Sequence, residues 1–182
     1  MRPQSYLPYS LKFITIAALL IAFPLSPFSQ STPPPVTVPP AVQMALGSDL
    51  RTDRSLAELA AKLLEAAKAA PSGTVSVTLD KYPTYFTMLC ARTKSGGAEL
   101  HKKFSDMFVV LDGEATEVIG GTIIDEKDDG DEVRGSHIEG GTRHVLHKGD
   151  VLTIPPNTPH QILLDANSTI SYYVVKVAAS TK

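Results

Sequence analysis

The feature that most constrains this chain is a long series of short segments, from residue 74 to 177, in which apolar and polar residues alternate. Val75, Val77 and Leu79, for example, are interleaved with threonine and serine. A repeat of two residues is typical of strands that bury one face. Many short strands separated by glycine-containing turns favour an all-β sandwich or barrel.

The strands predicted after this first one have clear boundaries. We expect them at Tyr85–Arg92, Glu99–His101, Met107–Leu111, Ala115–Ile119, Arg143–His147, Val151–Ile154, His160–Leu164 and Ile170–Val177. The predicted turns between several of them are Asp112-Gly113, Gly120-Gly121 and Lys148-Gly149-Asp150.

One helix precedes the strands, within residues 49–72. Ser55 and Glu58 have the spacing of a capping box, which predicts Ser55 as the N-cap. Apolar residues recur at helical spacing on one face, and Pro71 with Gly73 ends the pattern. We expect this face to pack on the outside of the barrel; dimerisation through it is the alternative.

The first 48 residues have a different character. Residues 13–23 are an unbroken apolar stretch, too short to span a bilayer comfortably but of the length found in secretory signals. We therefore predict a signal peptide over residues 1–30, with an uncleaved membrane anchor as the alternative. Residues 31–48 begin with a proline-rich run and are predicted to be an extended linker. The barrel would then occupy residues 73–180.

Composition excludes some classes of function. The formal net charge of −2 does not favour a nucleic-acid binder. The single cysteine, Cys90, cannot form an intramolecular disulfide, and its apolar surroundings in the sequence indicate a buried thiol.

The most specific stretch runs from Gly149 to His160. It resembles the second motif of the cupin superfamily, in which a glycine, a proline, a second glycine and a histidine follow at fixed spacing. Gly149, Pro155 and His160 fall in place, and Asn157 replaces the second glycine. Asparagine tolerates the same left-handed backbone conformation.

The first cupin motif is present in altered form. Asp106 and Gly113 have the family's separation, which puts His101 and Glu99 at the two histidine positions. The chain therefore offers Glu99, His101, Asp106 and His160 where the family has His, His, Glu and His. The resemblance covers about residues 74–177 and implies a double-stranded β-helix, or jelly-roll barrel, with one N-terminal helix.

These four residues suit a metal site, because Glu99 and His101 are two apart and so point to one face of a strand. Two imidazoles and two carboxylates would suit Fe, Mn, Ni or Zn, and we predict a divalent metal bound by these four residues. A metal-free pocket is the alternative, since two of the four residue types are changed. No organic cofactor is implied.

The segment between the two motifs is long. Residues 125–132 are mostly acidic and predict a solvated hairpin tip; a calcium loop would need a ligand spacing that is absent. We expect the whole insertion to form an extended hairpin or lid, or else a passive loop. Arg134 and Arg143 are candidates for binding an anion at the barrel mouth, whereas His144 and His147 would face opposite sides of a strand.

The function expected from these observations is that of an exported, periplasmic or secreted bacterial cupin. It would act on a small polar molecule, as a dioxygenase- or isomerase-like enzyme; the alternative is a non-catalytic module that binds or senses a small ligand. A homodimer is a further expectation.

Overall fold

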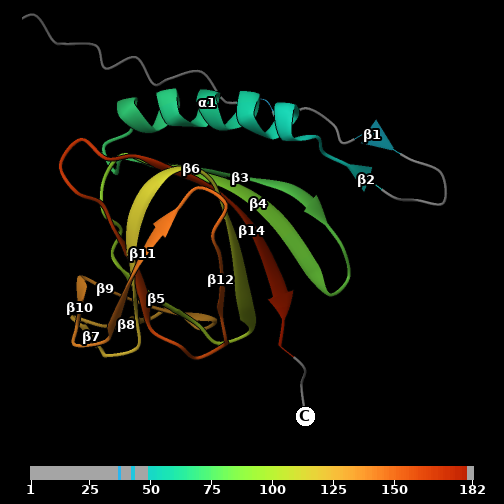
Figure 1. Ribbon diagram of the computed structural model, residues 1–182. Helices are drawn as coiled ribbons and strands as arrows, with labels where there is room; N and C mark the ends of the chain where they lie inside the picture. Colours follow the sequence, from blue (N-terminus) through green and yellow to red (C-terminus); the bar gives the residue numbers. More distant parts are fainter. Residues whose placement is uncertain (1–36, 38–41, 44–48, 180–182) are drawn as a thin grey trace, which may run out of the picture. The chain divides into compact units, whose positions relative to one another are not determined.

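The computed structural model describes residues 37, 42–43 and 49–179 (Figure 1). The predicted signal peptide and most of the predicted linker lie outside these residues. Within them, no helix is both long enough and apolar enough to cross a bilayer. The elements are β1 (Val42–Gln43), β2 (Asp49–Leu50), α1 (Asp53–Ala69), β3 (Thr74–Lys81), β4 (Tyr85–Arg92), β5 (Ala98–His101), β6 (Phe104–Ile119), β7 (Thr122–Ile124), β8 (Lys127–Asp128), β9 (Glu132–Gly135), β10 (His137–Glu139), β11 (Thr142–His147), β12 (Val151–Ile154), β13 (His160–Leu163) and β14 (Ile170–Ala178).

The strands form an antiparallel barrel, as the alternating pattern predicts. One run is β3-β4-β14-β6, and it continues through β13, β5, β9 and β8, while β11 and β12 also pair with β6. Figure 1 shows the strands curving around one another into a barrel. Alternate residues of β4 and β14, such as Cys90, Tyr172 and Val174, lie in the buried cluster within the barrel.

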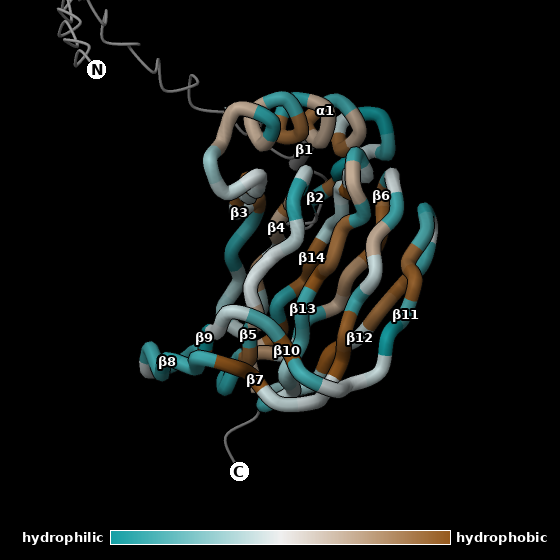
Figure 2. Tube along the Cα trace, turned by 90° about the vertical axis from the view of Figure 1, so that its left-hand side faces the viewer, coloured by the Kyte–Doolittle hydropathy of each residue, from teal (hydrophilic) through white to brown (hydrophobic). Residues whose placement is uncertain are grey.

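Helix α1 covers the outer face of the β3-β4-β14-β6 sheet (Figures 1 and 2). Leu59 and Leu63 pack there against Leu89 and Ala91, in a cluster separate from the barrel interior. The prediction that the leucine face covers the barrel is thus confirmed. Full burial of each leucine contributes about 1.5–3 kcal/mol.

The start of the helix differs from the prediction. Its N-cap is Thr52, whose Oγ1 accepts a hydrogen bond from the backbone N–H of Ser55 at 3.2 Å. Ser55 is therefore inside the first turn. The apparent capping box was misleading because Thr52 stands three residues earlier and supplies the same kind of oxygen.

Strand β6 is continuous through Asp112-Gly113, where the sequence predicted a turn. Its first part pairs with β14 and β12, and its second part pairs with β11 and β13. The register against β14 shifts by one residue at this point, which marks a β-bulge. Gly113 has φ +85°, and a Cβ there would lie 2.0 Å from the carbonyl oxygen of Thr169. The glycine thus lets one strand bend from one side of the barrel to the other.

The insertion forms two nested hairpins, in agreement with the predicted extended hairpin. β7 pairs with β10 at its base, and β8 pairs with β9 beyond it. The acidic segment forms the turn of the second hairpin. β9 also pairs with β5, so the insertion is bonded to the edge of the barrel.

The stretch from Gly149 to His160 has the backbone that the motif requires. Asn157 has φ +58°, the left-handed conformation predicted for it. Its backbone N–H donates to the carbonyl oxygen of His101 at 2.8 Å. This bond fixes the turn before β13 against the end of β5, and so places His160 beside His101.

Candidate metal centre

A cavity of about 420 Å³ lies inside the barrel. Strands β3, β4, β6 and β14 line one part of it, and strands β5, β9 and β13 line the other. Strands β4, β6 and β14 contribute apolar side chains to its walls, such as Met88, Phe108 and Val174, and a few charged ones. Strands β5, β9 and β13 contribute mainly polar side chains, which include Glu99, His101 and His160. The predicted donors therefore face a real space inside the barrel.

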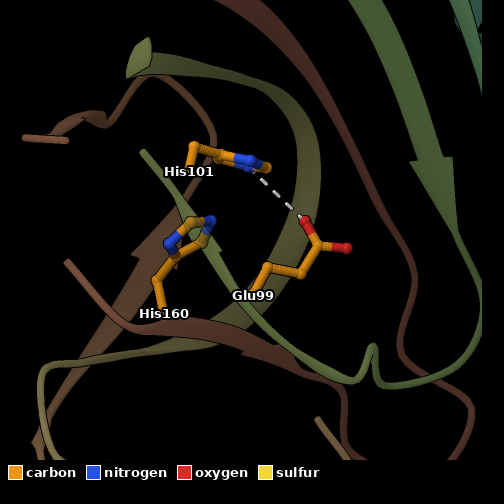
Figure 3. A group of neighbouring side chains, drawn as sticks. All are labelled: Glu99, His101 and His160. Carbon is orange, nitrogen blue, oxygen red and sulfur yellow. Dashed lines mark ion pairs between the residues drawn. The ribbon is translucent and has the colours of Figure 1, made fainter. Parts of the chain in front are cut away.

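Three of the four predicted ligands converge. The alternation of β5 puts Glu99 and His101 on one face, and β13 pairs His160 directly with Glu99. One donor atom from each of these residues lies within 4.8 Å of the other two (Figure 3). His101 and His160 are buried, and their ring centroids are 5.1 Å apart.

Contacts on the outer side of each imidazole determine which nitrogen faces the cluster. Nδ1 of His160 lies 3.0 Å from the carbonyl oxygen of Thr158, which can only accept a hydrogen bond. Nδ1 of His101 lies 3.1 Å from Oε1 of Glu132. In both rings Nδ1 is thus held by an oxygen acceptor, leaving Nε2 as the donor atom available to a cation.

The charges around the cluster keep its donors in metal-binding form. Burial lowers the pKa of His160, and the neighbouring His101 adds to this effect, so the neutral imidazole is favoured. Burial raises the pKa of Glu99, but nearby positive charges, that of Arg134 foremost and that of Arg92 as well, oppose this effect and the net pKa is lowered. A neutral imidazole beside an ionised carboxylate is a donor set that fits a divalent transition metal.

The fourth predicted ligand, Asp106, lies beside the cluster but is held by a lysine. Its Oδ2 is 3.5 Å from Nε2 of His101. Both of its carboxylate oxygens accept hydrogen bonds from Nζ of Lys176, at 2.8 and 2.7 Å. The two residues are directly paired in register between β6 and β14, and both are largely buried. Asp106 would thus have to exchange this lysine for a metal.

Arginine and glutamate from the insertion complete the surroundings. Arg134 donates to Oε1 of Glu99 at 2.9 Å and also pairs with Glu132. Glu99 therefore has its Oε2 toward His101. The sequence indicated Arg134 as a residue near the barrel mouth. It did not indicate a role for Glu132, because one glutamate within an acidic run cannot be distinguished from its neighbours by sequence alone.

Three other residues singled out from the sequence do not line this cavity, whereas Cys90 does. Arg143, His144 and His147 are exposed on β11. Cys90 is buried, and desolvation raises the pKa of its thiol to about 11, consistent with an inert side chain.

Sequence reasoning also missed Glu117, a fully buried glutamate on β6. Neither carboxylate oxygen has a hydrogen-bond partner among the described residues. Burial raises its pKa to about 8, against a smaller opposing effect of Arg92. Its alternation with Ala115 on β6 is the signal that could have placed it inside the barrel.

Comparison with known proteins supports the assignment to a class. The family described as an AraC-like ligand binding domain matches residues 134–181. Together with the antiparallel barrel and the two motifs, this match supports a protein of the cupin superfamily. A search among curated proteins found no match.

Solved cupin structures align with the chain at low similarity. The cupin domain of Cnp3 from Schizosaccharomyces pombe is 12% identical at a TM-score of 0.45, over 58% of this chain and 65% of that domain. A cupin 2 barrel protein from Salinispora arenicola is 18% identical at 0.42, over 59% and 78%. A DMSP lyase from Ruegeria pomeroyi is 13% identical at 0.44, over 60% and 49%. The match therefore spans just under two thirds of the Cnp3 domain and about half of the lyase. At this level the alignments give no information about the ligand or activity of this chain.

Proposed function

We propose that this chain binds one divalent transition metal through Glu99, His101 and His160 and acts on a small polar molecule held in the adjoining cavity. The observation that carries the proposal is the convergence of three donor atoms within 4.8 Å. The outward contacts of both Nδ1 atoms add to it, because they orient the rings before any metal binds.

The chain's own residues have distinct parts in such a site. Glu132 and the carbonyl of Thr158 hold the two imidazoles, and Arg134 holds the carboxylate of Glu99. The apolar wall formed by Met88, Phe108 and Val174 limits the access of water. A bound Fe, Mn, Ni or Zn ion would supply Lewis acidity at the open coordination positions, which is the chemistry required by a dioxygenase- or isomerase-like reaction.

Metal analysis of the freshly purified chain tests this proposal. We expect near one equivalent of transition metal per chain, and its loss in the His101→Ala/His160→Ala double variant. The matched control is His144→Ala/His147→Ala, which removes two exposed histidines of β11 and should keep the metal. Full metal content in the first double variant would overturn the assignment.

A second candidate function is a metal-free module that binds or senses a small ligand. The bond between Lys176 and Asp106 favours it, since the ammonium group already neutralises a carboxylate beside the cluster. This candidate predicts that no metal binds to refolded protein supplied with Fe, Mn, Ni or Zn, while a small metabolite still raises the melting temperature.

Export to the periplasm or outside the cell is part of the same proposal and rests on the apolar stretch at residues 13–23. Fusion of residues 1–30 to a reporter enzyme that is active only after export would test it. Reporter activity should appear with this segment and disappear when residues 13–23 are deleted.

A further inference from the structure

Arg92 lies in the same cavity, at the end remote from Lys176. On β4 the cavity is lined by Phe86, Met88, Cys90 and Arg92 in turn. Phe86 pairs in register with Lys176, and Arg92 pairs with Ile170. Arg92 thus lies at the other end of the β4 lining from Phe86 and its partner Lys176.

The guanidinium of Arg92 is held in place by neutral groups. Its Nε donates to the hydroxyl of Tyr172 at 2.9 Å, and its Nη1 donates to Oγ1 of Thr74 at 3.2 Å. A Cβ at position 96 would lie 2.6 Å from Nη1, so Gly96 is what allows the loop to approach the guanidinium. These contacts fix the plane of the group while leaving Nη2 without a hydrogen bond to any of residues 49–179.

The charge of Arg92 is also uncompensated by an ion pair within this part of the chain, unlike that of the other cations in the cavity. Arg134 pairs with Glu99 and Glu132, and Lys176 pairs with Asp106. The buried carboxyl of Glu117 makes no hydrogen bond with it. The guanidinium of Arg92 is held in a fixed orientation, is partly buried and faces a cavity, and its Nη2 can still donate to a ligand. Such a group is suited to binding a planar oxyanion.

The total charge of the cavity leads to the same conclusion. Its lining has three carboxylates and three cationic side chains, namely Glu99, Asp106, Glu132, Arg92, Arg134 and Lys176. A divalent metal would therefore give it a net positive charge. An anionic ligand would lower this net positive charge in a space where water is partly excluded.

We propose that Arg92 binds the carboxylate of a small organic acid and so orients the rest of that molecule toward Glu99, His101 and His160. A carboxylate is favoured over a phosphate, because a single guanidinium matches one charge in a planar fork. The cavity volume of about 420 Å³ accommodates a molecule of the size of benzoate. This inference rests on the proposed ligand-binding function and names its substrate class.

The experiment compares two pairs of probes that match in shape and differ in charge: acetate with acetamide, and benzoate with benzamide. Calorimetric titrations use the full chain, once treated with a chelator and once loaded with Mn(II). We expect at least one of the two carboxylates to bind at least tenfold more tightly than its amide. Arg92→Gln should remove this preference and leave the metal content unchanged, while Arg143→Gln, which alters an exposed arginine on β11, should leave both intact.

The chelator-treated arm separates this inference from the metal proposal. If no metal binds but Arg92→Gln still removes the preference for a carboxylate, the metal assignment fails and the role of Arg92 stands. Equal affinity for acid and amide in the unaltered chain, or no binding of either carboxylate, overturns the role of Arg92 even if that variant does not fold. A preference that survives in folded Arg92→Gln overturns it as well.

Discussion

The buried carboxyl of Glu117 should make the stability of the barrel fall with rising pH. Its pKa in the folded chain is raised to about 8 from the ordinary 4.5. The folded state therefore retains a proton that the unfolded state loses. The contribution of this group to stability is full below pH 4.5, declines through the interval from 4.5 to about 8, and then levels off. The variant Glu117→Gln keeps the shape of the side chain and cannot ionise in either state.

The size of the effect follows from the same two values. Retaining the proton costs about 1.4 kcal/mol for each pH unit above the unfolded pKa, or about 3 kcal/mol at pH 7. Between pH 5 and 8 the stability of Glu117→Gln should thus rise relative to the unaltered chain by roughly 3–4 kcal/mol. For a domain of this size, that corresponds to about 6–16 °C in melting temperature.

Urea unfolding of both chains at pH 5, 6, 7 and 8, with a chelator present throughout, measures this difference. The control is Glu58→Gln, because Glu58 is exposed on α1 and its replacement should give a flat profile. A difference between Glu117→Gln and the unaltered chain that stays constant within about 1 kcal/mol over this range would show that Glu117 is ionised in the barrel, and the reasoning from burial would be refuted.

Three further changes test other parts of the structure. Lys176→Met should release Asp106 from its ion pair and lower the stability of the metal-free chain by about 3–5 kcal/mol. It should also tighten metal binding at least tenfold, measured in competition with a chelator. Unchanged metal affinity would mean that Lys176 does not compete with the metal for Asp106. Gly113→Ala should cost about 2–4 kcal/mol in urea unfolding, because it adds a clash with Thr169 to a strained φ, whereas Gly120→Ala has a similar φ with open space around it and should cost only about 1 kcal/mol. Leu63→Ala should cost about 2–5 kcal/mol and the exposed Lys62→Ala almost nothing, and equal costs would contradict the packing of α1 on the sheet.

The sequence was sufficient for the class of fold, because alternation of period two and the glycine-containing turns are local signals. β4 and β12 have the predicted boundaries, and the turn at Asn157 has the predicted φ. The two errors, at Ser55 and at Asp112-Gly113, have a common physical origin. In each case a local pattern matched a cap or a turn, while a competing oxygen or a pairing between distant strands determined the outcome.

The candidate site was predictable only in part. Glu99, His101 and His160 follow from motif spacing and strand alternation. Lys176, Glu132 and Arg92 reach the cavity through pairings between strands far apart in the sequence, as between β14 and β6, or between β9 and β5. No local pattern encodes those contacts. The pairing of Asp106 with Lys176 shows the consequence, since a residue at a ligand position can have a different partner in the fold.

The attachment of β9 to β5 has a consequence for the dynamics of the centre. Glu132 and Arg134, which orient His101 and Glu99, belong to a short strand of the insertion. Local opening of a peripheral strand requires far less free energy than unfolding of the whole domain. Backbone amides of β9 should therefore exchange with solvent faster than those of β6 or β14. Each opening would release two orienting groups while the barrel stays folded, so the insertion sets how long the three donors remain aligned.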